Sequence, residues 1–396
     1  MSARPETAKA REAGARPAIL EAANVSKRFV KHLDLAGKIA QRLGSSIREE
    51  TVYAVDGVNL TVGAGEVVGL VGESGCGKST FGRMVAGILP PTEGSLSFDG
   101  KPVWQQGKVS SHDTALAIQM IFQDPFASLD PRMRVQDIIG EAPLVHGMVP
   151  RGQIDDYVAE TMLRVGLDPD FRRRYPHQFS GGQRQRIGIA RALAVKPRFL
   201  VCDEAIAALD VSIQAQVINL LEDLKQEFDL TLILIAHDLA VIRHMSDRVA
   251  VMYLGEVVEL AETDDLYARP LHPYTQALMQ AIPIPSPHSR GMLADLKGDV
   301  PSPLAPPSGC RFHTRCPHAT AICGTEKPLL SAAGEDRQVA CHHWHSIAGT
   351  AQDQNSEPPR TAAADRRFAL YRDWSQKQHK APSTGSRPRN TQRRSE

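Results

Sequence analysis

An α/β fold is predicted for this chain by three observations. A glycine-rich loop at 72–80 follows a short apolar segment at 66–71 and precedes a helical pattern at 80–86. From about residue 19 to residue 260, short Val-, Ile- and Leu-rich segments alternate with helical patterns, as strands and helices alternate in an α/β core. Residues 248–260 are typical of two strands that turn at Gly255.

Composition limits the classes of protein that this chain can belong to. Its 396 residues suffice for one domain of ordinary size and a smaller unit, and its net charge of +1 gives no overall attraction to nucleic acid or anionic lipid. We expect no nucleic-acid partner. The N-terminus lacks a secretory signal, and the strongest apolar run, 230–236, is too short to cross a bilayer. Work at a membrane would therefore require partner subunits.

Residues 72–80 read Gly-Glu-Ser-Gly-Cys-Gly-Lys-Ser-Thr and match the phosphate-loop pattern at every specified position. A glycine turn between a strand and a helix points backbone N–H groups at one place, where the helix dipole favours an anion. We expect Lys78 to reach the β- and γ-phosphates and Ser79 to ligate Mg²⁺. The sequence therefore predicts that the chain binds a nucleoside triphosphate. The predicted contacts come from Gly72, Glu73, Ser74, Gly75, Cys76, Gly77, Lys78, Ser79 and Thr80.

A second candidate site element is the apolar segment 198–204, which ends in two adjacent carboxylates. Asp203, at the end of the predicted strand, can hold Mg²⁺ directly or through water. Glu204 can polarise the water that attacks the γ-phosphorus, since phosphoryl transfer depends mainly on positioning and charge neutralisation.

A Ser-Gly-Gly-Gln segment, made of Ser180, Gly181, Gly182 and Gln183, precedes a helical run at 187–194. Adjacent glycines at a helix start form a second candidate anion site. Because this segment lies shortly before the Asp203–Glu204 strand, the chain resembles the ATPase subunit of an ABC transporter over roughly residues 19–345. The resemblance implies an antiparallel β part beside the α/β core. It also implies a second ATPase subunit, identical or paralogous. Two ATP molecules would then be held head to tail, each between the Ser-Gly-Gly-Gln segment of one chain and the phosphate loop of the other.

The same resemblance assigns further residues. It implies that Gln123 contacts Mg²⁺ and the attacking water, that His237 contacts the γ-phosphate, and that Asp210 lies at the dimer seam. Phe29 is expected to stack on adenine, with Tyr53 as the alternative. The segment at about 124–190 corresponds to a helical subdomain that receives the transmembrane subunits.

The C-terminal part narrows the resemblance further. Residues 270–278 and 309–317 resemble the extension of oligopeptide and dipeptide importer ATPases, a group that also includes nickel and glutathione importers. Four cysteines follow a C-x5-C-x6-C-x17-C spacing: Cys310, Cys316, Cys323 and Cys341. Four thiolates suit zinc or an iron–sulfur cluster. The absence of tight C-x2–4-C pairs favours iron–sulfur, and the resemblance implies a 4Fe–4S cluster.

These observations predict the following organisation: a disordered N-terminus at 1–18, the ABC nucleotide-binding domain at 19–268, a loop-rich extension with a four-cysteine site at 269–347, and a disordered basic tail at 348–396. The expected function is ATP hydrolysis that drives an importer of di- or oligopeptides or a related solute. Its expected partners are two transmembrane permeases and an extracellular solute-binding protein, with the chain on the cytoplasmic face of the membrane. The alternative is a soluble ABC ATPase that acts on ribosomes or nucleic acid. The sequence identifies neither the solute nor the second ATPase chain.

Overall fold

The computed structural model describes residues 16–31, 49–124, 126–205, 211–280, 298–334 and 336–348. All of them belong to one structural unit that extends to Ala351. The segments predicted as disordered ends lie almost entirely outside these ranges.

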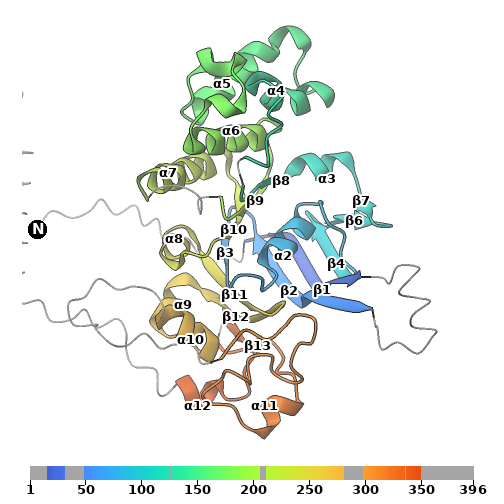
Figure 1. Ribbon diagram of the computed structural model, residues 1–396, viewed down its shortest axis with the longest axis vertical. Helices are drawn as coiled ribbons and strands as arrows, with labels where there is room; N and C mark the ends of the chain where they lie inside the picture. Colours follow the sequence, from blue (N-terminus) through green and yellow to red (C-terminus); the bar gives the residue numbers. More distant parts are fainter. Residues whose placement is uncertain are drawn as a thin grey trace, which may run out of the picture. The chain divides into compact units, whose positions relative to one another are not determined.

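An eight-stranded sheet runs through the described part of the chain (Figure 1). Its order is β13 (Ser331–Ala332), β14 (Gln338–Val339), β12 (Glu256–Glu262), β11 (Arg248–Tyr253), β3 (Val67–Val71), β10 (Thr231–Ile235), β9 (Phe199–Asp203) and β8 (Ile118–Ile121).

The five strands from β11 to β8 pair in parallel, whereas β11 and β12 form an antiparallel hairpin. Every residue of β3, β9 and β10 is buried, as expected for parallel strands that are covered on both faces. The predicted α/β core and the hairpin at Gly255 are confirmed.

A second, antiparallel sheet has the order β2 (Glu50–Gly63), β1 (Ala18–Lys31), β4 (Glu93–Phe98) and β5 (Lys101–Pro102). A short hairpin, β6 (Trp104–Gln105) and β7 (Lys108–Val109), follows it. One buried apolar cluster joins this sheet to the central one, because Val58 and Leu96 share it with Val68 and Phe81. The antiparallel part expected from the resemblance is therefore present.

The helices of the described residues divide into three groups by their position in the fold. Those beside the central sheet are α2 (Lys78–Val85), α3 (His112–Ala117), α7 (Val211–Phe228), α8 (Leu239–Met245) and α9 (Thr263–Ala268). A separate group contains α4 (Val135–Val145), α5 (Ile154–Arg164) and α6 (Gly181–Leu193), with 3-10 turns at Arg151–Gln153, Pro169–Arg173 and Pro176–Gln178. The last group is α10 (Pro273–Gln280), α11 (Ala321–Thr325) and α12 (Trp344–Ala348).

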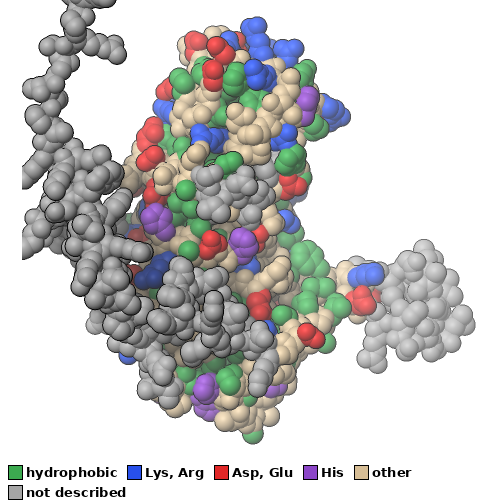
Figure 2. Space-filling model, turned by 60° about the vertical axis from the view of Figure 1, so that its left-hand side comes forward, with side chains coloured by type: hydrophobic (Ala, Val, Ile, Leu, Met, Phe, Trp, Pro, Cys, Tyr) green, Lys and Arg blue, Asp and Glu red, His purple; other side chains and the backbone are tan. Residues whose placement is uncertain are grey.

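Helices α4, α5 and α6 gather at one end of the described unit (Figure 1). They pack through apolar side chains such as Ile139, Met162 and Ile187, each fully buried. On the face seen in Figure 2, acidic and basic side chains are interspersed over this end. No helix in the described part of the chain combines the length and apolarity needed to cross a bilayer.

Beyond residue 298 the chain packs against the hairpin β11–β12 (Figure 1). Strand β14 pairs with β12 through Glu259–Val339 and Leu260–Gln338. At the same place Arg337 Nη2 donates to Glu259 Oε1 over 2.6 Å, and the backbone N–H groups of Leu271 and His272 donate to the same carboxylate. Glu259 is fully buried, so this carboxylate joins the hairpin to two later segments.

We predict that Glu259→Gln lowers the free energy of unfolding by about 3–5 kcal/mol, because it leaves the buried Arg337 guanidinium without its counter-charge. Urea unfolding followed by circular dichroism measures the change. The matched control is Glu50→Gln, which removes an exposed pair with Lys31 whose side chains are 59% and 83% exposed. The free energy of unfolding of the control should fall by less than about 1 kcal/mol. Equal decreases in the two variants would contradict the prediction.

Candidate active site

The glycine-rich loop connects β3 to α2, and two of its glycines are required by close backbone contacts. Gly72 has φ 151° and Gly77 has φ 107°, a region that side chains rarely adopt. A Cβ atom at Gly72 would lie 2.2 Å from the carbonyl oxygen of Met252, and one at Gly77 would lie 2.1 Å from that of Ala54. The loop is therefore pressed against β11 and β2, which positions the start of α2.

Lys78, the first residue of α2, is 5% exposed. Its Nζ donates to the carbonyl oxygens of Gly72 at 2.7 Å and Glu73 at 3.0 Å, so the amine lies across the loop. The Cys76 thiol lies 3.9 Å from Nζ, and burial raises the pKa of this thiol. Cys76 is therefore a neutral part of the loop, and Lys78 is its positive charge.

The hydroxyl of Ser79 donates to Asp203 Oδ1 over 2.7 Å. Asp203 ends β9 and is 1% exposed; burial raises the pKa of its carboxyl, and the Ser79 hydrogen bond opposes that rise. A hydroxyl and a carboxylate are oxygen donors of the kind that Mg²⁺ prefers. The structure thus brings together two of the residues that the sequence assigns to the magnesium site.

The Nε2 atom of Gln123 donates to Glu204 Oε2 over 2.5 Å. Gln123 follows β8 and Glu204 follows β9, and these strands are parallel neighbours. Glu204 has φ 45°, a strained backbone conformation for a residue with a side chain, and its N–H donates to Ile235 O at 2.9 Å. Both side chains therefore lie at the edge of the sheet where the carboxyl ends of parallel strands meet.

The remaining predicted residues are less closely connected. His237 is exposed just after β10, and Asp210 lies outside the described residues. Phe29 is 42% exposed, with Lys27 Nζ 5.4 Å from its ring centroid. Tyr53 lies on the adjacent strand opposite Arg28. Both aromatic residues thus occupy the β1–β2 hairpin, and the choice between them for adenine stays open.

The Ser-Gly-Gly-Gln segment forms the start of α6. The Ser180 Oγ accepts from the Gln183 N–H at 3.3 Å, and Gln183 Oε1 accepts from the Ser180 N–H at 3.0 Å, which is a capping box. A Cβ at Gly182 would lie 2.7 Å from Ile213 Cγ2, so a glycine is needed for α6 to approach α7 closely. Ser180 itself is exposed and available to another molecule.

Two residues of the C-terminal region contact the glycine-rich loop, and the sequence did not reveal them. Arg315 donates from Nη1 and Nη2 to the two carboxylate oxygens of Glu73, at 2.8 and 3.1 Å. Tyr274 accepts from the Glu73 N–H at 2.8 Å. Arg315 lies within the segment 309–317 that carries the importer resemblance, but no local pattern connects it to a residue 242 positions away.

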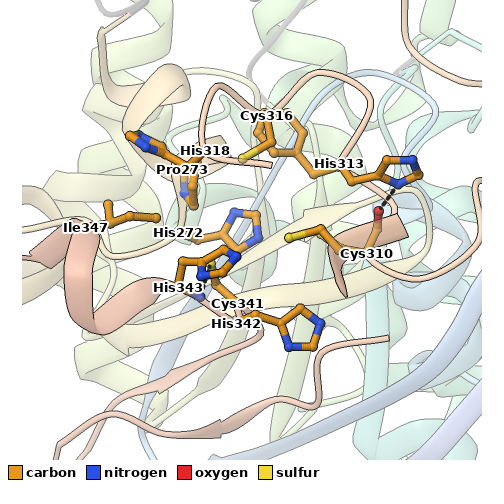
Figure 3. Close-up of a pocket in the computed structure, with 12 residues that line it drawn as sticks. His272, Pro273, Cys310, His313, Cys316, His318, Cys341, His342, His343 and Ile347 are labelled. Carbon is orange, nitrogen blue, oxygen red and sulfur yellow. Dashed lines mark hydrogen bonds between the residues drawn. The ribbon is translucent and has the colours of Figure 1, made fainter. Parts of the chain in front are cut away.

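The four cysteines predicted as metal ligands line one pocket, together with His272, His313, His318, His342 and His343 (Figure 3). The cavity measures about 10 Å³, close to the space that one water molecule needs. Burial raises the pKa values of Cys310 and Cys341 to about 11, so these thiols are protonated at neutral pH in this arrangement.

The donor types in this pocket suit a soft metal, but their geometry does not yet form a metal cage. Among the residues that the structure describes, no group of three or more Cys, His, Asp or Glu side chains is placed so that it could hold a metal ion. The described side chains therefore form neither a preformed 4Fe–4S site nor a preformed zinc site.

Comparison with known proteins defines the class. The family model described as ABC transporter matches residues 55–207. The putative oligopeptide transport ATP-binding protein YkfD of Bacillus subtilis is 51% identical over 76% of this chain and 92% of its own length. The chain belongs to the ABC transporter ATPase family, and it is an ATPase that binds ATP.

Further matches identify the branch and the fold. A second model, described as the oligopeptide/dipeptide transporter C-terminal region, matches residues 258–323. OppF, the oligopeptide transport ATP-binding protein of Salmonella typhimurium, is 52% identical over 72% of this chain and 86% of its own. The dimeric ATP-binding cassette MJ0796, solved with ADP and phosphate, is 27% identical with a TM-score of 0.51, over 62% of this chain and 98% of its own.

We predict that Gly77→Ala destabilises the protein much more than Gly75→Ala. Both glycines have positive φ, 107° and 79°, but a Cβ at Gly75 meets nothing within 4 Å. Gly75→Ala should therefore lower the free energy of unfolding only by the cost of a left-handed backbone at a residue with a side chain, about 1–2 kcal/mol. Gly77→Ala must also displace the Ala54 carbonyl, and it should lower the free energy of unfolding by more than about 3 kcal/mol. Chemical denaturation without nucleotide measures both losses. Similar losses would show that the contact with Ala54 does not constrain the loop.

Proposed function

We propose that this chain is the ATP-hydrolysing subunit that energises an importer of di- or oligopeptides or a related solute. The observation that carries the proposal is the meeting of Ser79 with Asp203 and of Gln123 with Glu204 at one sheet edge, beside the glycine-rich loop. The relatives named for oligopeptide transport support the choice of solute class.

In the proposed mechanism, the backbone N–H groups of the loop and Lys78 bind the β- and γ-phosphates of ATP. Ser79, Asp203 and Gln123 would hold Mg²⁺, which when bound would neutralise charge on the transferred phosphoryl group. Glu204 orients and polarises the attacking water.

The hydrogen bond from Gln123 holds the Glu204 carboxylate in place until nucleotide enters. His237, exposed at the end of the neighbouring strand, contacts the γ-phosphate in this proposal.

A complete site requires a second ATPase subunit. The exposed Ser180 and its neighbours through Gln183 would close over the phosphate loop of the other chain, with Asp210 at the seam. The dimeric ADP-bound state of the cassette MJ0796 supports this arrangement. Adenine would stack on Phe29, with Tyr53 as the alternative.

The proposal places the chain at the cytoplasmic face of the membrane, bound to two permease subunits through the group α4–α6 and served by an extracellular solute-binding protein. The relatives given above are named for transport and support this reading over an ATPase that acts on ribosomes or nucleic acid.

We also propose that the four cysteines of the extension hold a metal centre, a 4Fe–4S cluster in preference to zinc. Their position on one pocket supports the proposal. A 4Fe–4S cluster takes one thiolate per iron, so four cysteines on one pocket match its ligand count. The sequence lacks the tight C-x2–4-C pairs that are typical of zinc sites. Binding would require the pocket to open and the thiols to lose their protons.

We predict that ATP turnover of the assembled complex rises when the binding protein is loaded with a di- or oligopeptide. In the same complex Glu204→Gln should lower turnover by about 10²–10⁴-fold while ATP is still bound, because only the group that polarises water changes. Phosphate release and retained radiolabelled ATP measure the two effects.

The control for this experiment is Lys78→Ala, which should lose ATP retention as well as turnover, because it removes the cation that reaches the phosphates. Near-normal turnover by Glu204→Gln would refute the assignment of Glu204. Stimulation by other solutes but by no peptide would refute the solute class.

For the cysteine site, protein purified without oxygen should contain iron and acid-labile sulfide and absorb broadly in the visible range. Cys316→Ser should lower the iron content, whereas Cys202→Ser should not, since Cys202 is fully buried in β9. A colourless protein that contains stoichiometric zinc would contradict the iron–sulfur proposal.

A further inference from the structure

The C-terminal extension holds one residue of the phosphate loop by both its side chain and its backbone. The Glu73 carboxylate accepts two hydrogen bonds from Arg315, a bidentate ion pair, and the Glu73 N–H donates to the Tyr274 hydroxyl. The Arg315 side chain is 5% exposed and that of Glu73 is 23% exposed, so the pair is largely screened from solvent. Such pairs have a well-defined geometry.

This contact continues to the lysine that binds phosphate. Lys78 Nζ donates to the carbonyl oxygens of Gly72 and Glu73, at 2.7 and 3.0 Å. The peptide groups on both sides of the Glu73 Cα are therefore held: its N–H by Tyr274 and its C=O by Lys78. A shift of Glu73 would move the position from which Lys78 reaches a nucleotide.

Glu73 places a negative charge in a loop that binds a polyanion. An unpaired carboxylate there would repel the triphosphate, and the repulsion is strong because a partly buried site screens charge poorly. Arg315 supplies the matching positive charge, and the hydrogen bond to Glu73 raises the pKa of Arg315, so the guanidinium is charged at all physiological pH values.

Arg315 is itself held in place by an aromatic cluster. Its guanidinium carbon lies 5.9 Å from the ring centroid of Tyr253 and 6.0 Å from that of Phe312. These rings pack against Tyr274, with centroid distances of 4.7 and 5.4 Å. Phe312 and both tyrosines are fully buried, so the donor groups are pre-positioned.

We infer that Arg315 is a positioning residue for ATP: by neutralising Glu73 it lets the loop present Lys78 to the triphosphate without an unpaired carboxylate beside it. This inference goes beyond the proposed function, since it makes the C-terminal extension part of the ATP-binding machinery. A purely structural tie, which would only attach the extension to the core, is the competing explanation.

The two explanations differ in the sign of their effects on affinity, which can be measured in the purified full-length chain with Mg²⁺ and a non-hydrolysable ATP analogue. Arg315→Gln exposes the triphosphate to an unpaired carboxylate and should raise Kd about tenfold, or about 1.4 kcal/mol. Glu73→Gln leaves an unpaired cation near the phosphates and should lower Kd about threefold. The double variant should return to within about threefold of the wild type. The single-variant effects should shrink at high salt.

Lys327→Gln is the matched control, because it removes the same charge from the same extension but pairs with Asp56 and Glu256 rather than with the phosphate loop. It should leave Kd unchanged. A purely structural tie gives no reason for Glu73→Gln to bind ATP more tightly, so an unchanged or higher Kd in that variant would overturn the inference. An Arg315→Gln effect no larger than that of the control would overturn it as well. If Arg315→Gln does not fold, the Kd of Glu73→Gln for the ATP analogue tests the inference by itself. A lower Kd than that of the wild type supports the inference, and a higher Kd refutes it.

Discussion

The parallel pairing of β3, β10, β9 and β8 is the constraint on which the candidate active site depends. Leu70 lies opposite Ile235, and Ile235 lies opposite Asp203, so the ends of three strands are level. Neighbouring strands lie about 4.8 Å apart, and groups at these ends are therefore close although the sequence separates them widely. A slip of one residue would move Asp203 away from this level and exchange the side chains that β9 packs against each face of the sheet.

The site stores conformational and electrostatic strain at this edge. Glu204 adopts a left-handed backbone conformation, and the carboxyl group of Asp203 is almost completely buried. Both are stabilised by neighbours, through the Ile235 carbonyl and the Ser79 hydroxyl. Strained and desolvated polar groups of this kind are typical of functional sites.

The extension is attached to the core by arginines that each face a core carboxylate: Arg337 with Glu259, Arg311 with Asp56, and Arg315 with Glu73. Buried pairs add little net stability, because desolvation offsets most of the Coulomb attraction. Their geometry is demanding, however, so they determine where the extension lies. The glycine-rich loop is one of the places that the extension contacts, through Arg315 and Glu73.

The sequence by itself determined the class of fold, the glycine-rich loop, the two carboxylates at the end of β9 and the family, because these features follow from local patterns of a few consecutive residues. The grouping of the four cysteines was also predictable, and all four line one pocket, but their arrangement there was not predictable. Only the tertiary structure decided that Gln123 meets Glu204 and that Arg315 meets Glu73. Such contacts depend on how distant strands and loops pack, and no periodicity within a short segment encodes a partner 81 or 242 residues away.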